Sequence, residues 1–89
     1  MRNNEKNKFT IKKITIMKEF KIQAYTKAEL ALLYFPDSLT STTAVKHLMA
    51  WIRRNELLKK ELHRLGYLKT ARLLTPKEVA AIVYYLGEP

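Results

Sequence analysis

The last part of the chain decides the fold most clearly, since residues 75–87 are TPKEVAAIVYYLG. Thr75 is a favoured N-cap residue, Pro76 suits the first helical position, and Glu78 completes a capping box with the threonine. Apolar residues then recur at helical spacing, and Gly87 follows as a typical stop. The segment predicts a final helix that packs through Val79, Ile82, Val83 and Leu86.

A second capping box predicts another short helix near residue 26. The hydroxyl of Thr26 can accept a hydrogen bond from the amide of Glu29, whose carboxylate can reach back to the Thr26 amide. Pro36 disfavours a helical conformation just before it, so the helix should end at about Tyr34. The predicted inward stripe is Leu30, Leu33 and Tyr34.

Two further helices are predicted between the capping boxes. A turn ends in the candidate N-caps Thr40 and Ser41, and apolar residues at helical spacing then continue to Arg54. Residues 55–56 should break this helix, and the next should end at Gly66, which suits the left-handed position after a helix. The side chains expected to face the core are Val45, Leu48, Met49 and Ile52, followed by Leu58, Leu62 and Leu65.

Extended structure is predicted on either side of the three helices. Apolar and polar residues alternate from residue 14 to residue 24, which is typical of a half-buried strand. This stretch is long for a strand and Lys18 interrupts its inward face, so we expect a break near Met17. Residues 67–74 are predicted to be extended before the last helix. The expected order is strand, three helices, strand, helix.

Length and composition favour one small domain. The chain has 89 residues, of which 47% are hydrophobic, enough for one modest core. We expect residues 1–16 to be a basic, flexible extension and residues 17–89 to be a single helical domain with a small sheet. The sequence has no cysteine and no apolar run long enough to span a membrane, so we expect a soluble, cytoplasmic protein without disulfides or a transmembrane segment.

The net charge of +9 is unevenly distributed. Residues 1–21 hold seven Lys or Arg against two Glu, which gives +5, and the rest of the chain contributes +4. Such a balance favours a polyanionic partner, because Lys and Arg displace counterions from phosphate. Nucleic acid is the first expectation, followed by an anionic membrane or an acidic protein. The alternative is that the charge only keeps the surface solvated.

No motif predicts catalysis, a metal or a cofactor. His47 and His63 fall on different predicted helices and have no cysteine to complete a transition-metal site. Both glycines are explained as helix stops, so no glycine-rich phosphate loop remains. Ser38 and Ser41 lie near a helix start, where a hydroxyl usually caps, and neither has an activating base nearby in the sequence. We expect a protein that is not an enzyme, binds no cofactor and has no small-molecule substrate.

Two basic clusters are the candidate nucleic-acid-binding surfaces. On the second helix, Arg53 and Arg54 lie with polar and small residues opposite the predicted core face, and such a face could enter a major groove. Alternatively, it is a solvated face whose bases complement the helix dipole. The second cluster lies on the third helix and includes His63. Alternatively, its residues are ordinary neighbours on a helix surface, since their spacing is typical of such pairs. The complete candidate set is Thr43, Lys46, His47, Arg53, Arg54, Lys59, Lys60, Arg64, Lys69 and Arg72, with Ala50 as a small residue between donors.

Trp51 lies one residue outside the apolar stripe of the second helix. We expect it to cover the core from the flank of this helix, packed against the first or the last helix. Stacking on nucleic-acid bases is the alternative.

Several short motifs support a resemblance to a known family. They are Tyr25-Thr26-Lys27, Tyr34-Phe35-Pro36, Trp51-Ile52, Leu65-Gly66-Tyr67, Leu74-Thr75-Pro76 and Leu86-Gly87-Glu88-Pro89. Over residues 20–89 the chain resembles a family of short bacterial proteins known as a domain of unknown function. Its element order is also similar to that of the excisionase-like and mercury-resistance-regulator-like winged helices, which bind DNA. This second resemblance implies a mainly α fold with a small β component, winged helix-turn-helix-like, with about four helices and a two-stranded sheet.

These features predict a small accessory or regulatory protein that binds nucleic acid, with duplex DNA as the expected partner. The connection of residues 35–41 is longer than the three or four residues of a helix-turn-helix turn. The alternative is therefore a protein-protein interaction module without direct nucleic-acid contact. Its surface would use Trp51, Tyr67, Tyr84 or Tyr85 and the strand edge near residues 20–24.

Overall fold

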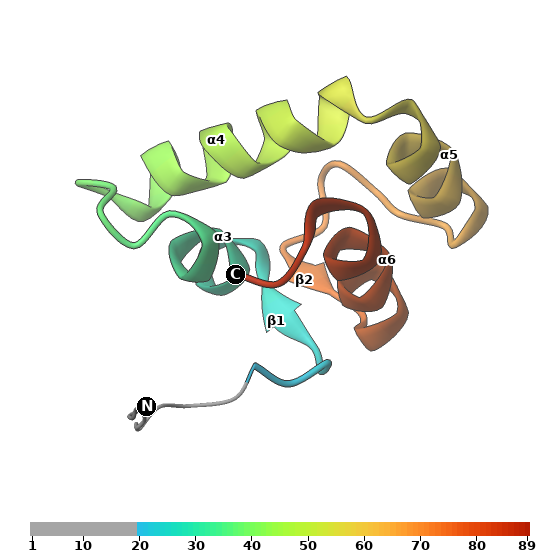
Figure 1. Ribbon diagram of the computed structural model, residues 1–89, viewed down its shortest axis with the longest axis horizontal. Coiled ribbons are helices and arrows are strands. Elements are labelled where there is room, and N and C mark those ends of the chain that lie inside the picture. Colours follow the sequence, from blue (N-terminus) through green and yellow to red (C-terminus); the bar gives the residue numbers. More distant parts are fainter. Residues whose placement is uncertain (1–19) are drawn as a thin grey trace, which may run out of the picture.

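The computed structural model describes residues 20–89, and its elements follow the predicted order (Figure 1). The chain is mainly helical, with one two-stranded antiparallel sheet, so the predicted combination of helices with a small sheet is confirmed. The elements are β1 (Tyr25–Thr26), α3 (Lys27–Tyr34), α4 (Ser41–Arg54), α5 (Glu56–Arg64), β2 (Leu73–Leu74) and α6 (Pro76–Leu86).

Both predicted capping boxes are present. At the start of α3, the Glu29 amide donates to Thr26 Oγ1 at 3.0 Å, and the Thr26 amide donates to Glu29 Oε1 at 2.9 Å. The same pair of hydrogen bonds joins Thr75 and Glu78 at the start of α6, with distances of 3.2 and 2.9 Å. Each box satisfies amides that the first helical turn leaves without partners, so these two helices begin where their local sequence dictates.

The other two helices also begin at side-chain caps. Thr40 Oγ1 accepts a hydrogen bond from the Thr43 amide at the start of α4. Asn55 ends α4 and also caps α5, because its Oδ1 accepts from the Leu58 amide at 2.9 Å. The predicted bend at residues 55–56 is thereby confirmed and assigned to one asparagine.

The predicted strand of residues 14–24 is wrong in the part that the structure describes. Residues 20–24 form no strand, and residues 14–19 lie outside the described range. The only two residues of β1 pair with β2, in the register Tyr25 with Leu74 and Thr26 with Leu73. Phe20 stacks on Tyr25 with ring centroids 5.6 Å apart, and Ile22 is 50% exposed, so residues 20–24 have neither a ladder partner nor a buried face.

The prediction of an extended segment over residues 67–74 is correct only at Leu73–Leu74. Turns occur at residues 65–66 and 69–70, and the chain joins the ladder only just before α6. The reason lies in contacts with α3, described below, that a local pattern does not contain.

The core of residues 20–89 is formed by α3, α4, α5, α6 and β2. Leu30, Leu48, Leu58 and Leu62 are fully or almost fully buried, and each contributes about 1.5–3 kcal/mol in hydrophobic burial. The prediction that Leu33 faces inward is wrong, since it is 45% exposed, and Ala31 is buried instead. The other buried apolar residues are Ala44, Ile52, Leu74, Val79, Ala81 and Ile82, whereas Val45, Met49, Leu65, Val83 and Leu86 are only partly buried against them.

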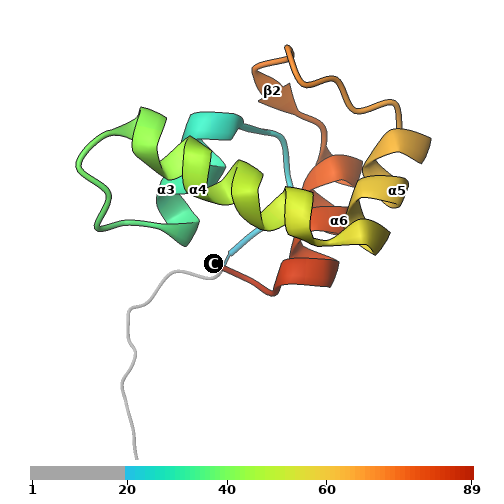
Figure 2. The same ribbon diagram turned by 90° about the horizontal axis from the view of Figure 1, so that it is seen from above.

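Helix α4 is the longest helix of residues 20–89 and lies along one edge of this part of the molecule (Figure 1). Helix α3 packs beneath its first half, and α5 follows beyond its end. Viewed from above, the connection between α5 and β2 lies on one side of α4 and the C-terminus lies on the other (Figure 2). Helix α4 thus has two flanks with different neighbours.

Across residues 20–89, no helix combines the length and apolarity needed to cross a membrane.

Candidate nucleic-acid interface

Two neighbouring hollows follow the flank of α4 that faces the connection of residues 67–72. Both are lined by Lys69, so they adjoin at this residue. We call their combined surface the cationic groove and define it by its Lys and Arg residues, which are Lys27, Lys46, Arg53, Lys59, Lys69 and Arg72.

The first hollow lies between the end of α4 and α5 and has a volume of about 460 Å³. Four apolar or aromatic side chains line it, namely Met49, Ile52, Leu62 and Tyr67. The remaining lining residues are Arg53, Lys59, His63 and Lys69. This hollow therefore combines apolar surface with side chains that carry or can acquire positive charge.

The second hollow lies between the start of α4, the start of α3 and residues 69–72, with a volume of about 570 Å³. Its cations are Lys27, Lys46, Lys69 and Arg72. Hydroxyl groups from Thr26, Ser41, Thr42 and Thr70 also line it. A set of ammonium, guanidinium and hydroxyl donors is suited to the oxygens of a phosphate group.

A Schellman motif at the end of α5 sets the direction in which the connection leaves the helix. The Gly66 amide donates to the carbonyl of His63, and the Tyr67 amide donates to that of Leu62. Gly66 has a φ of 85°, in the left-handed region that favours glycine. The predicted role of Gly66 is confirmed, and the motif places Tyr67 at the start of the groove wall.

Lys27 holds the rest of the connection against α3. Its backbone amide donates to the Arg72 carbonyl at 2.8 Å, and its Nζ donates to the Lys69 carbonyl at 2.7 Å. The same Nζ lies 4.8 Å from the ring centroid of Tyr67. These contacts explain why residues 67–72 turn rather than extend. They also show Lys27 to be a residue of the groove that the candidate set omitted.

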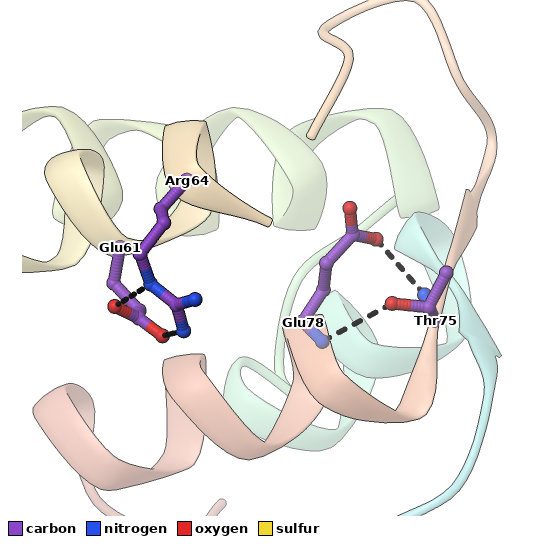
Figure 3. A network of polar contacts seen from close by, with 4 residues as sticks. All are labelled: Glu61, Arg64, Thr75 and Glu78. Carbon is purple, nitrogen blue, oxygen red and sulfur yellow. Dashed lines mark hydrogen bonds and ion pairs between the residues drawn. The ribbon is translucent and has the colours of Figure 1, made fainter. Parts of the chain in front are cut away.

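Three carboxylates are occupied away from the cations of the groove, and a fourth pairs with one of these cations. Glu29 serves the capping box of α3. Figure 3 shows Glu78 in the capping box of α6 and Glu61 paired with Arg64 on α5. The hydrogen bond from the Arg64 guanidinium lowers the pKa of Glu61 below its usual value. Glu56 forms an exposed ion pair of 3.1 Å with Lys59.

The two remaining carboxylates of residues 20–89 lie away from the groove. Asp37 lines a hollow on the opposite flank of α4, and Glu88 lies close enough to Tyr34 to affect its pKa. In the described part of the chain, no Asp or Glu lines either hollow of the cationic groove. The groove therefore concentrates positive charge without a carboxylate in its walls.

The structure divides the predicted site residues. It brings Lys46, Arg53, Lys59, Lys69 and Arg72 together in the groove. Five other candidates line neither hollow. Of these, Arg54, Lys60 and Arg64 are exposed, and Thr43 and His47 lie on the opposite flank. Thr43 is in addition part of the cap of α4, since its hydroxyl accepts from that of Thr40 at 3.0 Å.

An aromatic cluster forms the opposite flank of α4. The Phe35 ring lies 4.7 Å from the Trp51 ring at 71° and 5.3 Å from the His47 ring. Tyr34 also meets Trp51 edge-on, at 6.3 Å. Trp51 packs on the Tyr34 and Phe35 rings at the end of α3, as expected, but the prediction that it covers the core is wrong, since it is 40% exposed and does not pack against the buried residues.

Tyr34 ties this aromatic flank to the C-terminus. Its hydroxyl donates to the Gly87 carbonyl. Burial, together with the nearby Glu88 carboxylate, raises the pKa of Tyr34 to about 12. The phenol is thus held in its neutral, hydrogen-bonding form.

Over residues 20–89, no group of three or more His, Cys, Asp or Glu side chains is placed to hold a metal ion.

Comparison with known proteins identifies a family for this chain. The family model described as Domain of unknown function (DUF4248) matches residues 21–89, which is most of the chain. No curated protein and no solved structure matches. The predicted membership of an uncharacterised family is thereby confirmed, and the chain belongs to the DUF4248 family.

Proposed function

We propose that this protein is a small nucleic-acid-binding accessory or regulatory protein of the bacterial cytoplasm, that its partner is duplex DNA, and that it is not an enzyme. The observation that carries the proposal is the cationic groove. Six Lys or Arg residues line it and no carboxylate of residues 20–89 does. A phosphate backbone is the common cellular ligand with a matching row of negative charges.

The geometry supports an approach of the duplex along α4. This helix is 14 residues long, and Lys46 and Arg53 are exposed on it with the small Ala50 between them. A helix of this kind fits a major groove, where base edges present hydrogen-bonding groups. Lys69 and Arg72 on the neighbouring connection would then contact the flanking phosphates. This arrangement is in keeping with the resemblance to winged helices.

The cationic groove is not the only source of positive charge in the chain. Residues 1–21 carry a net charge of +5, which adds a sequence-independent attraction for polyanions. In this proposal the groove positions the duplex, and the N-terminal charges increase the encounter rate and the affinity.

An electrophoretic mobility assay with duplex DNA at several salt concentrations tests the proposal. If about five phosphates are neutralised, the slope of log affinity against log salt should be near −4.5. A fourfold increase in salt should then weaken binding by roughly several hundredfold. Absence of binding at low salt, or an affinity independent of salt, would contradict the proposal.

The alternative is a protein-protein interaction module, and the aromatic flank favours it. Trp51 is 40% exposed there and Leu39, on the adjoining loop, is 97% exposed. Exposed aromatic residues are enriched in protein interfaces. An acidic protein would be the corresponding partner of the basic chain. A negative result in the mobility assay would make this alternative the leading hypothesis.

A further inference from the structure

The hollow between α4 and α5 has larger apolar side chains in its lining than the second hollow, where the apolar residues are Ala28, Val45 and Ala71. Ile52 and Leu62 are only 5% and 2% exposed, and Met49 and Tyr67 are partly buried beside them. We call these four side chains the floor of the hollow.

Arg53, Lys59, His63 and Lys69 complete the lining. Arg53 and Lys69 contribute positive charge, whereas Lys59 forms an ion pair with Glu56. The volume of about 460 Å³ lies within the range of about 300–1,000 Å³ that is typical of small-ligand sites.

A fully paired duplex would use only part of this hollow. It presents phosphates, sugars and base edges to a protein, whereas the faces of its bases are stacked on one another. Phosphates would satisfy the cations, but the exposed parts of Met49 and Tyr67 would remain against water. A flat ring joined to a phosphate would use both features, since the ring would cover the apolar floor while the phosphate met the cations.

The floor is held in place by contacts within the protein. The Tyr67 hydroxyl donates to Met49 Sδ at 3.4 Å, and this bond links the connection to α4. Lys27 Nζ lies over the Tyr67 ring, and the Schellman motif fixes the Tyr67 backbone. The hollow therefore does not depend on a ligand to position its walls, which limits the ordering cost of binding.

We propose that this hollow binds one unpaired base of a nucleic acid whose phosphates lie along the cationic groove, an inference that rests on the function proposed above. The preferred partner is then DNA with a bulged or flipped base rather than a perfect duplex. Burial of the base in the hollow should increase the affinity for the nucleic acid about tenfold. This is the size of effect expected when one base stacks on a protein side chain.

Two bulged duplexes isolate the contribution of the base. They share sequence, length and number of phosphates, and each carries one extra nucleotide in one strand. The extra nucleotide is a thymidine in the first and an abasic residue in the second. Fluorescence anisotropy with the full-length protein should show about tenfold tighter binding of the thymidine bulge. A perfect duplex is measured in parallel.

A substitution in the floor provides the second test. Met49→Gln keeps nearly the same size and adds no charge but makes the floor polar, so the ratio of the two bulge affinities should fall towards one. Met49→Ala is the companion variant, which removes floor surface and should also reduce the ratio. Circular dichroism identifies which variants are folded.

The possible outcomes separate the inference from the function on which it rests. Equal affinity of the wild-type protein for the two bulges would overturn the inference, while binding of the perfect duplex would leave the proposed function standing. No binding to any of the three DNAs at low salt would overturn the proposed function itself. A tenfold preference that persists in both folded Met49 variants would place the base outside this hollow and overturn the inference.

Discussion

Tyr34 is the residue whose titration affects the fold most directly. Its hydroxyl is bonded to the Gly87 carbonyl, and burial raises its pKa from 10.0 to about 12. The folded state therefore holds this proton more tightly than the unfolded chain does. The stabilisation from Tyr34 is fully present below pH 10 and is lost as the pH rises through about 12.

Substitution of Tyr34 by phenylalanine tests this account. In urea denaturation, the free energy of unfolding of the wild type should fall more steeply between pH 10 and 12 than that of Tyr34→Phe. Below pH 10 the variant should be less stable by about 0.5–1.5 kcal/mol, the usual contribution of one hydrogen bond. Tyr84→Phe is the matched control, because Tyr84 is 80% exposed. Identical pH profiles for wild type and Tyr34→Phe would contradict the account.

At the scale of elements, the Schellman motif after α5 joins the helix to the groove wall. Gly66 has a φ of 85°, and a Cβ added there would meet no atom within 4 Å. The cost of Gly66→Ala is therefore conformational, and we expect a loss of about 1–2 kcal/mol in stability by urea denaturation. Gly66→Asn should lose less, because asparagine adopts the left-handed conformation more readily. An alanine variant as stable as the wild type would show that the motif is dispensable.

The helices were predictable from the sequence because their determinants are local. Thr26 and Thr75 each cap a helix together with a glutamate three residues later, and Gly66 ends α5, as the structure confirms. The strands were not predictable in the same way, since a strand needs a partner. Residues 20–24 alternate in polarity, yet β2 offers only Leu73 and Leu74 for pairing.

The sequence predicted which basic residues could form the candidate site, but it did not predict which of them the fold brings together. Lys46, Arg53 and Arg72 were expected from the density of basic residues, and the structure places all three in the groove. Lys27 was missed because its contacts with residues 67–72 join parts of the chain more than 40 residues apart. Arg64 was included although it pairs with Glu61, a neighbour on its own helix.

At the scale of the whole molecule, six of the eleven Lys and Arg residues in the described residues 20–89 gather on one flank of α4. One flank carries the cationic groove, and the other carries aromatic side chains, with Asp37 and Glu88 nearby. Such an asymmetry orients a polyanion towards one face, because the attraction falls off within a Debye length of about 8–10 Å at physiological salt. We propose that DNA binding depends on where the charges lie and not only on how many there are.

Two double variants with the same charge change test this claim directly. Lys46→Gln/Arg72→Gln removes two cations from the groove, and Lys60→Gln/Arg64→Gln removes two from α5 that line neither hollow. The measurement is the slope of log affinity for duplex DNA against log salt. The account predicts that the groove variant flattens the slope by about 1.8, at 0.9 per lost phosphate contact, and that the α5 variant leaves it nearly unchanged. Equal flattening by both variants, or flattening by the α5 variant alone, would contradict it.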